Sequence, residues 1–249
     1  MNFNNILVIG IDTDTQKKIY STTSSYSKSL YVVEKKNTAK NILIRRLKKR
    51  GVFSVINQLL FQLLIQRTHK YLCKDVSTYK KILIEDKIIL GQSINSEDSI
   101  KKVRVLNPDL IVLAGCRILN KSFIESFSCP IINIHLGLTP KYRGVFGGVW
   151  PILMSDIDNI GVTLHHVNTG IDTGNIISQK KIKFNTKLNV QEVNNILLDE
   201  GLELLRNFIN EPRNINNYNL TKGSLFYHPG ITDFIKYYVK KNFNLCKSI

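Results

Sequence analysis

The sequence predicts an α/β fold in which helices flank a mostly parallel β-sheet, with a short C-terminal strand and helix extension. Two short, continuous apolar runs, NILVIGID at 5–12 and PDLIVLAG at 108–115, have the composition of strands buried on both faces of a sheet. Segments with helical periodicity lie between the apolar runs. This alternation is typical of a parallel sheet, which we expect to extend to about residue 136.

The region between these two runs predicts further alternating elements. A second strand is expected in KSLYVVEKK, 28–36, followed by a mostly helical segment at 39–72 that Gly51 divides into two helices. The segment DKIILGQSINSED, 86–98, predicts a short strand and then a helix-capping sequence. The capping residues open a helix that carries SIKKVRVL, 99–106.

The second half of the chain predicts elements of both kinds, with strands whose polar and apolar residues alternate more clearly. They are, in order, a short helix at 119–127, a strand from Ile131, strands at 159–167 and 174–184, a helix at 190–209, a loop at 220–230 and an amphipathic helix at 231–243. We therefore divide the chain into a main domain at 1–185 and a C-terminal helical extension at 186–249 that packs on it.

Positive charge dominates the composition: 35 Lys and Arg against 19 Asp and Glu give a formal net charge of +16. This charge is consistent with a polyanionic partner, a phosphate-bearing substrate or an anionic membrane surface. The lysines are scattered along the whole chain, which favours ordinary solvated faces. The densest patch, RRLKKR at 45–50, could bind phosphates or acidic lipid head groups, and a solvated helix face is the alternative.

The composition argues against several classes of protein. The longest apolar stretch, 52–65, is interrupted by Asn57, Gln58 and Gln62 and is shorter than the roughly 20 apolar residues that a membrane span needs. The N-terminus has no basic leader and only a short apolar run, so we expect a cytoplasmic protein. The four cysteines show no CxxC spacing, so neither a zinc site nor a disulfide framework is predicted.

Asn133 and His135 stand out in the stretch INIHLGLTPKYRG, 132–144, because they are polar residues at the end of an apolar strand. Residues two apart on a strand point to the same side. A histidine can act as a general base or a hydrogen-bond donor near neutral pH, and an asparagine amide can donate to an oxyanion. Taken singly, Asn133 could cap a strand end and His135 could be a hydrogen-bonded core residue.

Asp172 is the best candidate for a carboxylate that would orient His135 and stabilise its protonated form. It lies between two glycines in a loop where the backbone can approach a ligand closely. Because the sequence has no Ser or Cys nucleophile elbow, these residues favour acyl transfer by direct attack of a substrate amine. The consecutive His165 and His166 are expected to face opposite sides of a strand, and we assign neither of them a role.

Together these pieces resemble the formyltransferase family that uses 10-formyltetrahydrofolate. Its signature combines an Asn-x-His strand, a Pro-x-Tyr/Trp-Arg-Gly loop, a Gly-Val-Thr strand and an Asp-Thr/Ala-Gly loop, and the chain matches it in order over 108–179. The resemblance implies a Rossmann-like formyltransferase fold, a catalytic domain at 1–185 and 10-formyltetrahydrofolate as co-substrate. It implies no metal ion.

The resemblance also implies roles for individual positions. Asn133, His135 and Asp172 would form the catalytic set. The acceptor amine would attack the formyl carbon, Asn133 and protonated His135 would stabilise the oxyanion, and Asp172 would raise the pKa of His135. The other implied contacts are with the pterin, at Leu113, Gly115, Arg117, Ile118, Thr169 and Gly170, and with the acceptor, at Tyr142, Arg143 and Gly144.

Three kinds of acceptor are compatible with the resemblance. Methionyl-tRNA formyltransferases add a C-terminal β-barrel domain, whereas the segment after Gln179 predicts mainly one strand and two helices here. Glycinamide ribonucleotide formyltransferases have a Gly-Ser-rich phosphate loop after the first strand, where this chain has GIDTDTQKK, 10–18. The stretches GCRIL, 115–119, and LTPKYRGVFGG, 138–148, look most like enzymes that act on nucleotide-linked amino sugars.

We therefore predict an N-formyltransferase for a nucleotide-linked, dTDP-bound amino-dideoxy sugar in O-antigen or polysaccharide synthesis. A basic protein suits such a negatively charged nucleotide-sugar. We expect this small-molecule partner rather than a stable nucleic-acid partner or a membrane span, and the sequence allows a homodimer. The non-enzymatic alternative is a basic module that binds nucleic acid or a membrane surface through the same fold.

Overall fold

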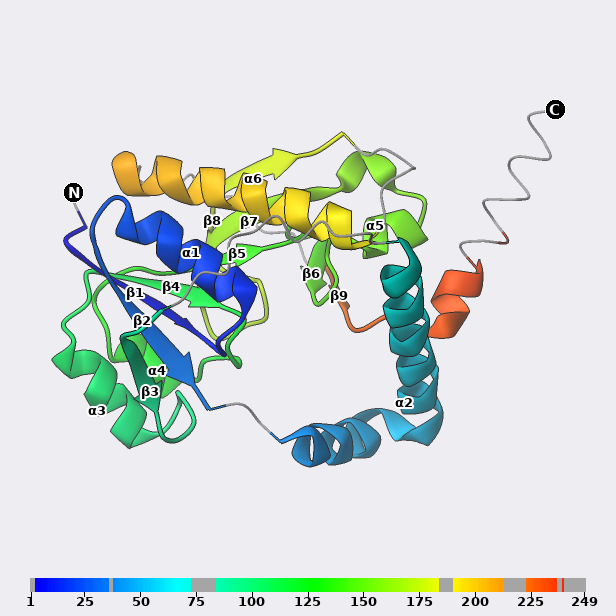
Figure 1. Cartoon of the computed structure of the whole chain (residues 1–249), viewed down its shortest axis with the longest axis horizontal. Helices are drawn as coiled ribbons and strands as arrows, with labels where there is room; N and C mark the ends of the chain where they lie inside the picture. Colours follow the sequence, from blue (N-terminus) through cyan, green and yellow to red (C-terminus); the bar gives the residue numbers. More distant parts are fainter. Residues whose placement is uncertain are drawn as a thin grey trace.

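A mostly parallel β-sheet forms the centre of the molecule (Figure 1). The computed structural model describes residues 3–35, 38–72, 84–183, 190–212, 223–236 and 239 of the chain. Within these ranges, the strands of the main sheet lie in the order β3-β2-β1-β4-β5-β7-β8. Their bounds are β1 Asn5–Gly10, β2 Lys28–Glu34, β3 Lys87–Leu90, β4 Leu110–Ala114, β5 Ile131–His135, β7 Gly161–His166 and β8 Ile176–Lys181.

The directions of the strands confirm the predicted fold class. Strands β1 to β5 all run parallel to one another. β7 is antiparallel to β5, and β8 is antiparallel to β7. The chain builds the sheet outward from β1 to β3 and then crosses back to place β4 beside β1. Ligands of such sheets bind at the carboxyl ends of the strands. For β4 and β5, these ends are Ala114 and His135.

Helices cover both faces of the sheet (Figure 1). α1 and α6 share a hydrophobic core with β1, β4 and β7 on one face, and α3 and α4 pack on the other. No helix in the described ranges is long and apolar enough to cross a lipid bilayer. The helix bounds are α1 Asp14–Ser24, α2 Ala39–Leu72, α3 Glu97–Val105, α4 Lys121–Glu125, α5 Trp150–Leu153 and α6 Val190–Asn210, with a 3-10 turn η1 at Ile157–Asn159.

The start of α3 confirms the predicted capping sequence. The Ser96 side chain accepts a hydrogen bond from the Ser99 N–H, which satisfies one of the free donors of the first turn. Glu97 and Asp98 add negative charge at the same end, where the helix dipole is positive. The local sequence therefore determines where α3 begins.

Gly51 divides α2, as predicted, into two helices that meet at an angle (Figure 1). Its backbone angles, φ 76° and ψ 164°, lie in a region that glycine adopts far more readily than other residues. The second helix packs through Phe61, whose ring centroid lies 6.4 Å from that of Phe146 and 6.0 Å from that of Phe234. Its outer side chains include the exposed apolar residues Val52, Phe53, Ile56, Leu59, Leu60 and Leu63.

The C-terminal segment differs from its prediction at one place. The sequence predicts a loop over 220–230, but β9 (Ser224–Phe226) pairs in parallel with β6 (Tyr142–Gly144). A strand of three residues is too short to show alternation, and its hydrogen-bonding partner comes from a distant part of the chain. Residues 231–236 are helical as predicted, and the rest of that predicted helix, apart from 239, lies outside the described residues.

α6 begins shortly after residue 185, the predicted end of the main domain. Its side chains Val193, Leu197 and Leu205 are fully buried in the core that also holds β1 and β7. The division between 1–185 and 186–249 stays a prediction.

Candidate active site

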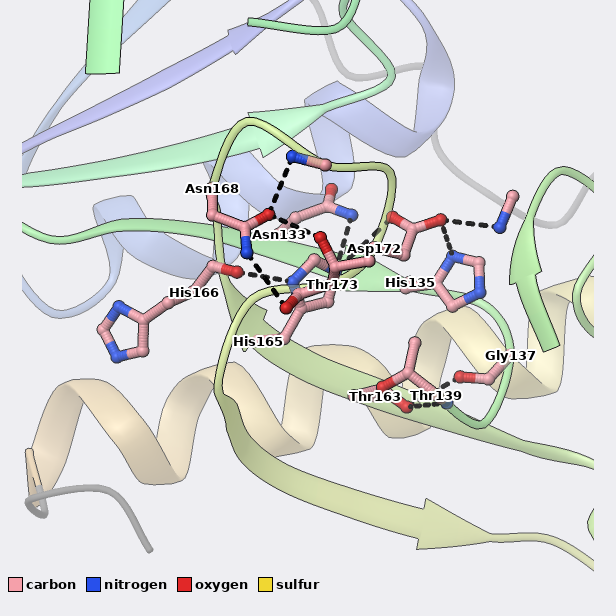
Figure 2. A network of polar contacts seen from close by, with 12 residues as sticks. Asn133, His135, Gly137, Thr139, Thr163, His165, His166, Asn168, Asp172 and Thr173 are labelled. Carbon is pink, nitrogen blue, oxygen red and sulfur yellow. Dashed lines mark hydrogen bonds and ion pairs between the residues drawn. The ribbon is translucent and has the colours of Figure 1, made fainter. Parts of the chain in front are cut away.

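β5 carries Asn133 and His135 at the carboxyl edge of the sheet, as the two-residue spacing predicts. Its antiparallel register with β7 sets His165 opposite Asn133 and Thr163 opposite His135. His135 and His165 are both buried, with 6% and 3% of their surface exposed. Polar groups of two neighbouring strands therefore meet inside the protein (Figure 2).

The loop after β5 is tied to β7 through Thr163. The Thr163 hydroxyl donates to the Gly137 carbonyl at 2.7 Å and accepts from the Thr139 N–H at 3.1 Å (Figure 2). The Gln179 amide on β8 donates to the same hydroxyl at 2.9 Å and to the Thr139 carbonyl at 2.7 Å. Thr163 therefore needs its hydroxyl, and these hydrogen bonds hold the loop after β5 beside His135.

Asp172 reaches this group from the loop between β7 and β8. Its Oδ2 accepts a hydrogen bond from the Gly144 N–H at 2.8 Å and lies 3.4 Å from Nδ1 of His135 (Figure 2). Its Oδ1 lies 3.5 Å from Nε2 of His165. Gly174 is required in this loop because a Cβ there would overlap the His166 carbonyl oxygen. The structure thus brings the three predicted catalytic side chains together.

Asn168 gives the Asp172 loop its shape. The Asn168 Oδ1 accepts from the Gly170 N–H at 3.0 Å and from the Thr173 hydroxyl at 2.7 Å. The Asn168 amide in turn donates to the Thr173 carbonyl at 3.0 Å. Asp172 itself has φ 49°, a left-handed conformation that Asp tolerates better than most residues.

His165 is the residue that sequence reasoning missed. Its Nδ1 donates to the His166 carbonyl at 2.7 Å, so its Nε2 carries the lone pair and accepts from the Asn133 amide at 3.3 Å. His165 is therefore the inward-facing member of the pair with His166, which is only half-buried. The strand register opposite Asn133 is the signal that could have identified it.

His135 carries a lowered pKa in this environment. Burial is the largest cause of that lowering, and the Asp172 charge acts in the opposite direction without overcoming it. The resemblance implies a His135 pKa raised by Asp172, and that expectation omits the larger effect of burial. Since a carbonyl only accepts, Nε2 of His135 donates to the Tyr142 carbonyl at 2.6 Å. The neutral ring therefore carries its lone pair on Nδ1, beside Asp172.

Asp172 is ionised at neutral pH. Burial raises the pKa of its carboxyl, but its contacts with His165 and His135 and the hydrogen bond from the Gly144 N–H together lower it below its usual value. A proton that arrives at Nδ1 of His135 is consequently stabilised by an adjacent carboxylate. The pair can take up a proton reversibly inside a buried site.

A cavity of about 800 Å³ opens onto these groups. Asn133, His135, His165 and Asp172 all line it. The predicted pterin contacts Leu113, Gly115, Arg117, Ile118 and Gly170 also line it, whereas Thr169 does not. Of the predicted acceptor contacts, Gly144 lines the cavity and Tyr142 and Arg143 do not.

Tyr142 and Arg143 instead hold the wall of the cavity in place. The Tyr142 hydroxyl donates to Oδ2 of Asp156 at 2.5 Å, and the side chain is buried. Arg143 donates from Nη2 to the Gly223 carbonyl at 2.6 Å, which anchors its own strand to the segment before β9. A direct contact of either residue with substrate stays a prediction.

Glu34 shapes the turn that follows β4. This buried carboxylate forms an ion pair with Arg117 and accepts hydrogen bonds from the Arg117 N–H at 3.2 Å and the Ile94 N–H at 3.2 Å. The Arg117 charge is therefore already paired. Gly115, with φ 72°, lets the chain leave β4 sharply and brings the turn to the cavity.

The cavity has the size and the lining of a site for a small organic molecule. Its volume lies within the range of about 300–1,000 Å³ that small-molecule sites have. Apolar side chains Leu113, Ile118, Leu119 and Val167 line it next to the polar groups of β5 and β7. Among the described residues, no group of three or more His, Cys, Asp and Glu side chains could hold a metal ion.

Comparison with known families defines the class of this protein. The sequence model of the formyl transferase family matches residues 5–209. The chain therefore belongs to the formyl transferase family, which confirms the resemblance seen in its motifs. The family uses 10-formyltetrahydrofolate, and the match extends through α6.

The curated relatives of this chain include methionyl-tRNA formyltransferases. Methionyl-tRNA formyltransferase of Clostridioides difficile is 30% identical over 152 residues, which is 57% of this chain and 49% of that protein. The corresponding enzyme of Syntrophomonas wolfei is 35% identical over 129 residues, 51% of this chain and 41% of that protein. The chain thus spans about half the length of the curated relatives that it matches.

A solved structure shares the fold over most of the chain. A sugar N-formyltransferase from a Shewanella species superposes with a TM-score of 0.58 at 19% identity and covers 93% of this chain and 78% of that one. At this level of identity the similarity establishes the fold.

Proposed function

We propose that the protein transfers a formyl group from 10-formyltetrahydrofolate to the amine of a nucleotide-linked amino sugar. The observation that carries this proposal is the meeting of Asn133, His135 and Asp172 on one wall of a single cavity. An amide donor, a buried neutral imidazole and a carboxylate are the groups that acyl transfer to an amine requires. Family membership supplies the formyl donor.

Each catalytic side chain has one task in the proposal. When bound, 10-formyltetrahydrofolate supplies the formyl carbon that the acceptor amine attacks. Asn133 donates an N–H to the oxygen on which negative charge develops. His135 accepts the proton of the attacking amine at Nδ1, and Asp172 stabilises the imidazolium that results. The bond between the formyl carbon and the folate nitrogen then breaks, and the imidazolium returns the proton to that leaving nitrogen.

His165 acts as a positioning residue for Asn133. An asparagine amide has two N–H donors, and one of them is bonded to Nε2 of His165. This bond fixes which end of the amide is the nitrogen and leaves the second N–H for the developing oxyanion. The His166 carbonyl in turn fixes the tautomer of His165.

The turn after β4 and the loop after β7 are proposed to hold the pterin. Leu113, Gly115 and Ile118 offer apolar surface and backbone groups on one side, and Gly170 lies on the other. Arg117 is held by Glu34, so its role is to position the turn rather than to bind a free charge. Thr169 lies in the same loop as Gly170 and is kept as a predicted contact.

Formyl transfer should lose rate at low pH with an apparent pKa below 6.5, the ordinary value for histidine. Below that pKa His135 is protonated and accepts no proton, and above it the ring is neutral and active. Asp172→Asn removes the charge that raises the pKa of His135, so the acid limb should move to still lower pH while the maximum rate falls. The pH dependence of kcat/KM measures both effects. An acid limb at or above 6.5 in the unaltered enzyme would contradict the assignment of His135.

The acceptor is inferred from charge and cavity. A nucleotide-linked amino sugar carries a nucleophilic amine at one end and a diphosphate in its middle. The cavity joins the catalytic groups to three arginines of α2, Arg45, Arg46 and Arg50. A dTDP-linked amino-dideoxy sugar for O-antigen or polysaccharide synthesis fits this pattern. A formyltransferase of the same fold, from Anoxybacillus kamchatkensis, has been crystallised in complex with UDP-4,6-dideoxy-4-formamido-L-AltNAc and tetrahydrofolate.

Methionyl-tRNA is the second candidate acceptor, because the curated relatives that share 30–35% identity bear that name. A direct test incubates the full chain and 10-formyltetrahydrofolate with thymidine- and uridine-linked amino sugars, glycinamide ribonucleotide or methionyl-tRNA. Release of tetrahydrofolate and the mass of the formylated product are measured. Turnover of an amino sugar, at least about a hundredfold above the other acceptors, supports the proposal. Turnover of methionyl-tRNA or glycinamide ribonucleotide alone overturns it.

A further inference from the structure

We propose that Arg45, Arg46 and Arg50 of α2 form a subsite for the diphosphate of the acceptor. This inference rests on the proposed function, because it assigns the non-reacting part of the same substrate. The three arginines come from the first helix of α2, before the break at Gly51. They line the same cavity as Asn133, His135 and Asp172.

The charge of this cluster has no counterpart in the described part of the chain. Other cations near the sheet have carboxylate partners, such as Arg117 with Glu34 and Lys87 with Asp12 at 2.9 Å. Within the described ranges, no carboxylate lies within ion-pair distance of the three arginines. Clustered like charges are unfavourable unless an anion joins them. The cluster is therefore suited to a ligand that brings negative charge.

The guanidinium groups of Arg46 and Arg50 are oriented by neutral partners. Arg50 stacks over the Tyr227 ring, with its central carbon 3.7 Å from the ring centroid. Arg46 Nη2 lies 3.3 Å from Nε2 of His228, and since arginine only donates, that nitrogen of His228 accepts. Both partners lie in the segment after β9 and line the cavity. They hold the arginines in place without neutralising them.

His228 stays neutral while it performs this task. Burial is the main cause that lowers its pKa to about 4, and the charges of Arg46 and Arg50 add to the effect. With Nε2 occupied by Arg46, the ring proton sits on Nδ1, a buried atom without a hydrogen-bond partner in the described structure. The neutral ring of His228 therefore leaves the charge of the arginine cluster unchanged.

A diphosphate matches these donors better than a single carboxylate does. Arginine presents its N–H groups in a planar fork that binds phosphate oxygens in pairs, and stacking on an aromatic ring leaves the edge of that fork free. Three guanidinium groups can surround the two phosphoryl groups of a nucleoside diphosphate. The acceptor would then extend from α2 to β5 across one cavity, with its amine at Asn133 and His135.

The test compares two pairs of charge-removing substitutions on the same helix. Arg46→Gln with Arg50→Gln removes two cavity arginines, and Lys40→Gln with Lys48→Gln removes two exposed charges that do not line the cavity. Calorimetric titration with inorganic pyrophosphate should show binding to the unaltered protein and to the lysine-substituted control. The arginine-substituted protein should bind at least about tenfold more weakly. Equal affinities for pyrophosphate in all three proteins would overturn the subsite.

Steady-state kinetics distinguish the diphosphate subsite from the proposed formyl transfer to an amino sugar. With an amino-sugar acceptor, the arginine substitutions should raise the KM of the acceptor by about tenfold or more and leave the KM of the folate unchanged. If pyrophosphate binding depends on the arginines but no amino sugar is formylated, the subsite stands and the proposed acceptor is wrong. If amino sugars are formylated with an unchanged acceptor KM, the subsite is wrong and the function stands.

Two further measurements guard against misfolding and a different ligand. Thermal unfolding is recorded for each variant. If the glutamine variant unfolds at a lower temperature than the unaltered protein, the subsite is tested with Arg46→Lys and Arg50→Lys together. This variant keeps both positive charges but loses the planar fork of the guanidinium groups. Its pyrophosphate affinity should still be reduced at least about threefold; an unchanged affinity contradicts the subsite. Arginine variants that lose tRNA binding but keep pyrophosphate binding would likewise contradict the diphosphate subsite.

Discussion

Replacement of His135 by alanine is expected to lower kcat for formyl transfer by about 10²–10⁴-fold, the range that general base catalysis contributes. The imidazole is neutral because it is buried, and its Nδ1 lies 3.4 Å from the Asp172 carboxylate that would stabilise the protonated ring. No other lone pair of comparable basicity is positioned in this way beside Asn133 in the described structure, since Nε2 of His165 already accepts from the Asn133 amide.

Steady-state kinetics with saturating folate and acceptor measure this loss. His166→Ala is the matched control, because His166 is the neighbouring histidine of β7 and does not line the cavity. The control should keep kcat within about threefold of the unaltered enzyme. A His135→Ala protein that folds normally and keeps a similar kcat would remove His135 from the catalytic set.

Asn133→Ala is expected to lower kcat by about 10²–10³-fold, the loss that follows removal of one oxyanion donor. Its amide acts where negative charge develops, so the loss should fall mainly on kcat and only weakly on either KM. The substitution also leaves Nε2 of His165 without its donor, which adds a smaller cost in stability.

Asn133→Asp tests the same donor by a different route. It keeps the size of the side chain but replaces both N–H donors with a carboxylate that repels a developing oxyanion. Its kcat should be at least as low as that of the alanine variant. Activity near that of the unaltered enzyme in either variant would show that Asn133 does not stabilise the oxyanion.

Most of the fold could be predicted because its signals are local. Strands β1 and β4 are continuous apolar runs, the Ser96 cap marks the start of α3, and Gly51 marks the break in α2. β9 escaped prediction because its three residues form a strand only through pairing with β6. Three residues are too few to show the alternation of polar and apolar side chains that predicts a strand.

The grouping of Asn133, His135 and Asp172 was predictable for a similar reason. Asn133 and His135 share a strand, and their spacing alone puts them on one side. Asp172 could be nominated because its flanking glycines indicate a loop that comes close to other groups. Their motif predicts that Tyr142 and Arg143 lie at the site, and their side chains bond to Asp156 and Gly223 in the structure. A motif shows that a segment is near a site and leaves the direction of each side chain open.

The sequence by itself determined most of the longer strands and helices, the polar pair at the end of β5 and the glycine-bounded Asp172, because periodicity and turn chemistry act over a few residues. Only the tertiary structure decided that His165 rather than His166 meets Asn133, because that choice depends on the register of β5 against β7. It also decided that burial outweighs Asp172 in setting the pKa of His135, and that Arg45, Arg46 and Arg50 of α2 line the cavity. These outcomes depend on contacts between residues far apart in the chain, and no local pattern encodes them.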